Sequence, residues 1–401
     1  MSKYFNICNL YILLWCLYSL QGTLYSRGSI ISQGLLTIIL VMSVYYAVLA
    51  NEKYTFPPYM KALNLLVAMF TVYGVTLLFS GEVLIIKEDH LGAVSNKDYL
   101  KNIYMSLLPI YTFFVFGKIG LLTENVIRRW IPLFILVAIA AYFENQNAAI
   151  ERAEEIMSVQ EEFTNNAGYS FLAIVPLLMF IKKTIWQYLL LLICGVFIIS
   201  AMKRGAIIIC AISLVLFFYY TLKGASLKRK VLTSVLVIGS VVAIVYYVSY
   251  MLDTSEYFDA RLEQTFAGDA SNREDMYPIL FRQIFYFATP LQFLFGHGAW
   301  GTLKISDNFA HNDWLEIGIN QGMLGVVVYL IYWIAFLKTA IGLRQNRTLY
   351  EVMLLIILIF LAKTMFSMSY DSMPIYVSVC IGFCMAHYGK VEINSLKNKS
   401  I

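Results

Sequence analysis

Long apolar runs recur along almost the whole sequence, and they limit what the chain can fold into more than any other feature. A helix needs about 20 predominantly apolar residues to cross a bilayer, and twelve stretches come close to that length. These stretches are residues 4–20, 29–50, 58–80, 99–121, 127–144, 167–182, 185–202, 205–222, 230–252, 314–337, 349–366 and 372–388. Only 14% of all residues are charged, whereas soluble domains are about 25% charged. The sequence therefore predicts an all-α integral membrane protein with about 12 transmembrane helices, in which residues 1–401 form a single polytopic domain.

The charges between these stretches predict how the chain is oriented. If the N-terminus is cytoplasmic, the cytoplasmic segments hold 18 Lys and Arg residues against 4 acidic residues. The segments on the other side then hold 12 basic and 21 acidic residues. Because Lys and Arg concentrate in the cytoplasmic loops of membrane proteins, we expect both termini to be cytoplasmic.

One segment between predicted helices is much longer than the rest. It covers residues 253–313, and the predicted orientation places it on the outward side. A loop of this length in a compact protein is usually functional. Its sequence predicts short helices within the loop, among them an amphipathic helix from residue 275 to about residue 288.

Three short motifs lie on this outward side. Lys203-Arg204-Gly205 forms a basic turn between two spans, and Ser271-Asn272-Arg273 lies in the long loop. His311-Asn312 ends the loop and is followed by Gly322 and Gly325. In order and spacing, the set resembles the landmarks of the bacterial O-antigen ligase and O-antigen polymerase superfamily.

This resemblance implies an enzyme of the bacterial cytoplasmic (inner) membrane with its active face in the periplasm. Such enzymes transfer glycan from undecaprenyl diphosphate without a metal. The polymerase branch moves a growing chain onto the next lipid-linked repeat unit, and the ligase branch moves a finished chain onto lipid A–core. We favour polymerase, because this aromatic-rich chain departs from familiar ligase patterns outside the motifs. The ligase remains the alternative.

A flippase or transporter of lipid-linked sugars is a second alternative, from a different class of protein. Transporters place polar or charged groups near the membrane midplane and are often built from internal repeats. The cores of the twelve stretches carry no Asp, Glu, Lys or Arg, and the sequence shows no internal repeat. Both observations favour an enzyme.

The expected reaction requires positive charge around the departing diphosphate. Arginine fits this role because its planar guanidinium stays charged and binds phosphate through two hydrogen bonds. We select Arg204 and Arg273 for it, with Lys203, Arg261 and Arg282 as further candidates. The sequence contains no Asp-x-Asp pair and no His/Cys cluster, so arginine rather than a metal is expected to offset the phosphate charge.

His311 is the candidate base that removes the proton from the attacking hydroxyl. It precedes the outward end of a predicted helix, whose partial positive charge favours neutral imidazole. Asn312 is expected to cap that helix, and Glu316 to orient the ring or bind a hydroxyl. Asn166 stands where the superfamily also has asparagines, and amides both donate to and accept from sugar hydroxyls.

The expected partners follow from this interpretation. They are the undecaprenyl-diphosphate-linked glycan and the lipid bilayer, and a chain-length regulator is a candidate protein partner. No cofactor and no nucleic acid are expected.

Overall fold

The computed structural model describes residues 6–81, 95–156, 165–223, 225–254, 263, 273–306 and 308–389. Two elements of the sequence analysis lie outside these ranges, namely the candidate Arg261 and the Ser271-Asn272 part of the second motif. Arg273, the third residue of that motif, is described.

The described residues are almost entirely helical, as the sequence predicted. The helices are α1 (Ile7–Ser19), α2 (Ile30–Lys53), α3 (Pro58–Phe79), α4 (Asn96–Leu107), α5 (Pro109–Lys118), α6 (Glu124–Ile156), α7 (Ala167–Ile174), α8 (Thr184–Ser200), α9 (Arg204–Leu222), α10 (Leu227–Thr254), α12 (Arg273–Arg282), α13 (Pro290–Phe295), α14 (Gly301–Ser306), α15 (Asp313–Asn320), α16 (Gly322–Gly342), α17 (Arg347–Phe366) and α18 (Ile375–His387). A 3₁₀ helix, η1 (Val175–Phe180), continues α7, and a π-helical turn, η2 (Gln283–Phe287), continues α12.

All twelve apolar stretches form helix, but they do not form twelve long helices. Within the described residues, seven helices are by themselves long and apolar enough to cross a membrane: α2, α3, α6, α9, α10, α16 and α17. Other stretches are shorter or broken. The stretch 99–121 divides into α4 and α5 just before Pro109, which lacks the N–H that a continuous helix requires. The stretch 314–337 divides at Gly322, which has a φ of +67°.

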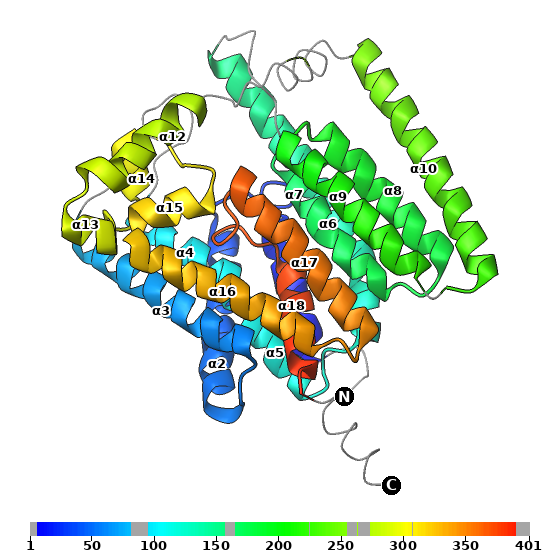
Figure 1. The fold of residues 1–401 in the computed structure, drawn as a ribbon, viewed down its shortest axis with the longest axis horizontal. Helices are drawn as coiled ribbons and strands as arrows, with labels where there is room; N and C mark the ends of the chain where they lie inside the picture. The colour runs from blue at the N-terminus through cyan, green and yellow to red at the C-terminus, as the bar shows by residue number, and fades with distance from the viewer. Residues whose placement is uncertain are drawn as a thin grey trace.

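Figure 1 shows how these helices are arranged. The last helices, α16 to α18, lie in the middle of the molecule, between α2–α5 on one side and α6–α10 on the other. Helices α12 to α15 gather at one end, and α10 stands at the outer edge beside α8. The described residues 273–306 and 308–313 of the predicted long loop therefore belong to a helical cap on one end of the bundle.

Polar contacts at the two ends agree with the predicted alternation of the chain. At the outward end, Arg27 pairs with Glu144 at 2.6 Å, and Tyr73, from the stretch 58–80, donates through its hydroxyl to the Phe295 carbonyl of the long loop at 2.5 Å. Residues assigned to the inward side also meet, since Arg347 donates to the Lys223 carbonyl. The helix ends are thus sorted as the charge pattern predicts.

Small residues allow α5 and α18 to pack closely. A Cβ atom built on Gly382 would lie 2.5 Å from Phe113 Cβ and 2.8 Å from the Phe113 carbonyl carbon. Lipid does not reward apolar contacts between helices as water does, so such interfaces depend on close van der Waals packing. Gly382 is therefore required where the backbones of α5 and α18 come together.

We expect Gly382→Ala to lower the stability of the protein by about 1–3 kcal/mol, because the added methyl forces α5 and α18 apart. Gly239→Ala is the matched control, since a Cβ on Gly239 in α10 meets nothing within 4 Å. Thermal unfolding of the purified variants in one detergent provides the measurement. Equal melting temperatures for both would contradict the proposed packing.

Candidate functional site

The basic turn between α8 and α9 is held in an unusual backbone conformation. Met202 has a φ of 51°, in the left-handed region that few residues other than glycine adopt. Lys203 follows as the residue that caps α9, and Arg204 is the first residue of the helix. The turn is also fixed from the side, because the Asn165 N–H donates to the Ala201 carbonyl at 2.9 Å.

Gly205 lets three helices approach one another beside this turn. A Cβ on Gly205 would lie 2.5 Å from the Tyr169 hydroxyl of α7 and 2.7 Å from Phe366 Cβ of α17. No larger side chain fits without displacing one of them. The Arg-Gly pair of the first motif therefore combines a cationic residue with the glycine that allows α9 to pack against the end of α17.

Arg273 reaches the same place from the helical cap. It is the first residue of α12, and its Nη2 donates to the Phe366 carbonyl in the last turn of α17 at 3.2 Å. A cation is stabilised there by the partial negative charge of the helix C-terminus. Two motifs separated by about 70 residues thus converge on Phe366.

His311 lies within reach of both groups of cations. Burial lowers the pKa of its imidazole to about 4, and the positive charges of Lys203 and Arg273 act in the same direction. The ring is therefore neutral at pH 7 and able to accept a proton. Its φ of 50° is the third left-handed value among described residues other than glycine, after Met202 and Trp300. Such strained residues cluster at functional sites.

The residues after His311 anchor the start of α15. As predicted, Asn312 caps this helix, with its Oδ1 accepting from the N–H groups of Trp314 at 3.0 Å and Leu315 at 3.2 Å. Asp313 is fully buried. Its carboxylate accepts from the Tyr329 hydroxyl at 2.5 Å and from the Ser369 N–H at 2.8 Å. His311 is therefore fixed on its C-terminal side by a capped helix that is joined to α16 and to the segment after α17.

Glu316 braces the loop rather than bonding to the His311 ring. Its carboxylate accepts from the Thr302 hydroxyl, from the Ala310 N–H at 2.9 Å and from Asn320 Nδ2 at 3.1 Å. Ala310 immediately precedes His311, so this bond also helps to place the histidine. Of the two roles expected for Glu316, orienting the ring takes an indirect form through Ala310, and binding a substrate hydroxyl stays a prediction.

The sequence analysis missed a buried charged cluster next to these residues. Lys363, in the last turn of α17, is only 3% exposed. Its Nζ donates to the Ser372 hydroxyl at 3.0 Å and lies 5.3 Å from the centre of the Tyr169 ring. It is close enough to Asp313, Asp371 and Lys203 for their charges to interact. Lys363 therefore lies near the end of the apolar stretch 349–366, outside the uncharged core that the sequence analysis described.

Asp371 is the other residue of this cluster that was not assigned a role. Burial raises the pKa of its carboxyl, and the positive charge of Lys363 opposes that effect. Among the described residues its buried Oδ1 has no hydrogen-bond partner. A lysine inside an apolar stretch, with an aspartate eight residues later, is a signal that the sequence offered, since charged groups at membrane depth are usually paired and functional.

The remaining candidates lie outside the cluster around His311. Arg282 is exposed in the last turn of α12, roughly 13 Å along the helix from Arg273 at 1.5 Å per residue. Asn166 is exposed, and it makes no capping bond to α7. Its neighbour Asn165 is buried instead, and its Nδ2 donates to the Tyr142 carbonyl at 2.8 Å.

The glycines of the third motif have a packing role. Gly322 takes its positive φ at the break between α15 and α16, and a Cβ there would lie 2.5 Å from the Gly296 nitrogen. The backbone of residues 296–298 lies directly against this break, with the His297 N–H donating to the Ile319 carbonyl at 2.7 Å. Among the described residues, no group of three or more His, Cys, Asp or Glu side chains is placed to hold a metal ion.

Comparison with known proteins adds a family to this geometry. Residues 189–330 match the family model described as O-antigen ligase. This part of the chain is therefore similar to the O-antigen ligase family. Members of the O-antigen ligase family are membrane glycosyltransferase-like enzymes. A search of the curated proteins gave no match.

The segment that matches the O-antigen ligase family contains most of the cluster but not all of it. It runs from α8 into α16, so it includes Lys203, Arg204, Arg273 and His311. It ends before α17 and therefore leaves out Lys363 and Asp371. The matched third of the chain thus contains the cations and the histidine. The buried charged cluster also needs Lys363 and Asp371, which lie in α17 and in the segment after it.

We expect the His311 imidazole to titrate near pH 4 in the protein without substrate, because burial and its cationic neighbours lower its pKa. Replacing Lys203 by Gln removes one of these positive charges, so the His311 pKa should rise toward its ordinary value of about 6.5. NMR of histidine-labelled protein measures both titrations, and a His311→Gln sample assigns the signal. A pKa near 6.5 that does not respond to Lys203→Gln would contradict the placement.

We expect Lys363→Met to destabilise the protein by about 3–5 kcal/mol, because it leaves buried carboxylates without their cation. Adding Asp371→Asn to Lys363→Met should recover part of that loss, since the unpaired negative charge is then removed. Thermal unfolding of the two single variants and the double variant gives the coupling. Strictly additive effects would show that Lys363 and Asp371 do not interact.

Proposed function

We propose that this protein is a glycan polymerase that joins undecaprenyl-diphosphate-linked repeat units into a surface polysaccharide such as O-antigen, capsule or exopolysaccharide. The observation that carries the proposal is the position of His311, a neutral base next to Lys203 and Arg273 at one end of a membrane bundle. A lipid-linked sugar presents its diphosphate at such a surface while its polyprenyl chain remains in the bilayer.

In the proposed reaction, an acceptor sugar hydroxyl attacks the anomeric carbon of the donor glycan. A new C–O glycosidic bond forms, and the bond between the anomeric carbon and the diphosphate oxygen breaks. The hydroxyl proton passes to His311, and the bonding electrons leave with undecaprenyl diphosphate. Arg204, Arg273 and Lys203 offset the negative charge that grows on the departing group.

Donor binding is proposed to strengthen His311 as a base. The positive charges of Lys203 and Arg273 contribute to the low pKa of the empty site. A bound diphosphate adds negative charge next to the same cations, so the His311 pKa rises toward the value at which a general base is most effective. Proton transfer is then favoured only when the donor is in place.

Asp371 is proposed to help bind the acceptor sugar. Its buried Oδ1 has no hydrogen-bond partner among the described residues, although Lys363 nearby stabilises its charge. A sugar hydroxyl could supply the missing donor, and leaving a buried carboxylate unsatisfied is costly. We therefore assign Asp371 to orienting the acceptor rather than to removing its proton.

The ligase remains a second candidate, because the matching family model is described as O-antigen ligase. In that case the acceptor is lipid A–core, while the donor and the roles of His311 and the cations stay the same. A transporter gains little support, because Lys363 lies in the last turn of α17 rather than in the middle of the helix. We place the site on the periplasmic face of the inner membrane, with both termini cytoplasmic, on the basis of the charge pattern.

His311→Ala should abolish polymer formation by removing the base, and Arg273→Lys should lower activity by about 10- to 100-fold because the planar fork is lost. Glycan banding of a deletion strain that expresses each variant measures both effects, with protein level checked by immunoblot. Arg27→Lys is the matched control, since the Arg27 side chain is exposed and pairs with Glu144 away from the residues around His311.

The same banding separates the two candidate functions. A strain that makes one repeat unit on its lipid acceptor has lost a polymerase, whereas polymer that stays on the carrier lipid indicates a lost ligase. Long glycan in the His311→Ala strain would show that His311 is not the base.

A further inference from the structure

A polar cavity lies at the end of the bundle opposite His311. Its volume is about 300 Å³, within the lower range of ligand pockets. Helices α9 and α17 each have one end at the candidate site and the other at this cavity. The 19 residues of α9 span roughly 28 Å at 1.5 Å per residue, so the two sites are separate.

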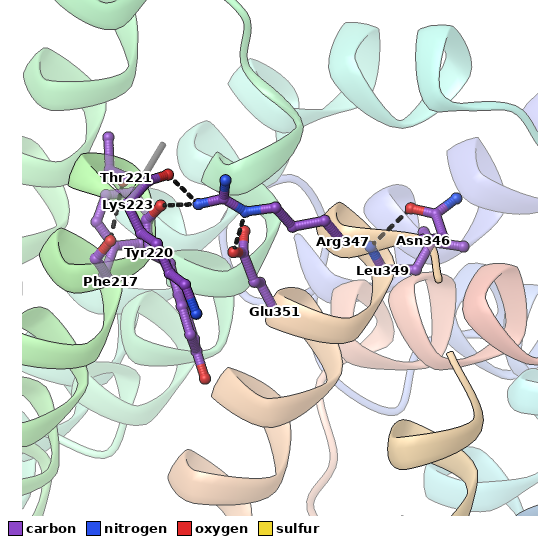
Figure 2. Close-up of polar contacts among 8 residues, drawn as sticks. All are labelled: Phe217, Tyr220, Thr221, Lys223, Asn346, Arg347, Leu349 and Glu351. Carbon is purple, nitrogen blue, oxygen red and sulfur yellow. Dashed lines mark hydrogen bonds and ion pairs between the residues drawn. The ribbon is translucent and has the colours of Figure 1, made fainter. Parts of the chain in front are cut away.

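Arg347 is one of the residues that line this cavity. Figure 2 shows its polar contacts, which join α17 to the end of α9. Its Nε donates to Glu351 Oε1 at 2.6 Å, and its Nη2 donates to the Tyr220 carbonyl at 2.9 Å and to the Lys223 carbonyl. These carbonyls belong to the C-terminal end of α9, where a cation is favoured. The charge of Arg347 is therefore largely offset by Glu351 and by these two carbonyls.

The other cations around the cavity are not balanced in this way. Lys182, Lys223 and Arg229 also line it, and the second lining carboxylate, Glu124, pairs with Arg128 at 3.8 Å. Within the described ranges, neither Lys182 nor Arg229 forms an ion pair with a carboxylate. The cavity therefore carries an excess of positive charge that favours an anion.

Gln187 adds an independent sign that a ligand binds here. It lines the cavity and is only 2% exposed. Its Nε2 donates to the Leu178 carbonyl at 3.0 Å, which fixes the orientation of the amide. Its buried Oε1 is left without a hydrogen-bond partner in the described part of the chain. A ligand with a hydroxyl group would satisfy this acceptor.

The surroundings identify the source of such a ligand as lipid. Helix α10 has only 6% of its most apolar window buried within the protein, and Leu227 is 78% exposed beside Arg229. This exposed apolar face is suited to contact with lipid chains, and Arg229 lies in the first turn of α10, where the end of a span meets the headgroups. Basic pockets between helices at that level bind anionic headgroups.

We propose that this cavity binds the glycerophosphate headgroup of an anionic phospholipid. The phosphate lies between Lys182 and Arg229, and a headgroup hydroxyl donates to Gln187 Oε1. A lipid held there bridges the first turn of α10 to the ends of α9 and η1, and it stabilises α10, which has few contacts of its own with the bundle. The proposal concerns a separate site and does not depend on the reaction at His311.

The test uses the full chain in nanodiscs that contain phosphatidylglycerol in a phosphatidylcholine background. Native mass spectrometry after transfer to detergent counts the phosphatidylglycerol that stays bound. Lys182→Gln combined with Arg229→Gln should reduce this retention by about tenfold or more, since each lost charge-assisted bond to phosphate weakens binding. Lys228→Gln combined with Lys230→Gln is the matched control, because both lysines are exposed in the same turn of α10 and do not line the cavity.

Competition with soluble glycerol 3-phosphate distinguishes the two sources of this chemistry. The lipid site is supported if the Lys228→Gln, Lys230→Gln variant retains phosphatidylglycerol, the Lys182→Gln, Arg229→Gln variant loses it, and millimolar glycerol 3-phosphate does not displace the lipid. Displacement by glycerol 3-phosphate supports the phosphate pocket but assigns it to a soluble ligand. Equal loss of lipid from both pairs would overturn the proposal, because only general surface attraction would then be acting.

Discussion

The close approach of α7, α9 and α17 at Gly205 is the contact on which the candidate site depends. Because Gly205 has no side chain, the Tyr169 hydroxyl and Phe366 can lie against the first turn of α9. The basic turn is thereby brought to the end of α17, where the Phe366 carbonyl accepts from Arg273 of the helical cap. Without that contact, the cations of two distant motifs would have no common position.

A buried charged cluster lies close to these cations. Lys363, Asp313 and Asp371 occupy positions where burial alone would disfavour their charged forms. Together they compensate one another and connect α15, α17 and the segment between α17 and α18. Asp313 directly follows the cap residue Asn312, so the same cluster that stabilises the helix ends also fixes the backbone around His311. The residues that stabilise the helix ends therefore also position the candidate base.

The two ends of the bundle differ in how they treat their cations. At the cap end, Lys203 and Arg273 lie next to a neutral histidine and lower its pKa. At the other end, Arg347 of α17 is hydrogen-bonded to the Tyr220 carbonyl of α9, while Lys182 and Arg229 line a cavity. The first arrangement suits a reaction in which negative charge develops, and the second suits a bound anion that stays.

The sequence by itself determined the helical membrane class, the sorting of helix ends and the order of the motifs, because these depend on apolar length and on the distribution of charge along the chain. It also predicted the Asn312 cap, which depends only on neighbouring residues. Tertiary structure decided which candidates meet, because side chains 38 to 108 residues apart, such as Lys203, Arg273 and His311, come together only through helix packing. For the same reason the sequence analysis did not predict the partners of Glu316, because Thr302 and Ala310 meet its carboxylate only in the folded loop. It also missed Lys363, whose buried charge is stabilised by the charges of Asp313 and Asp371 that the fold brings close to it.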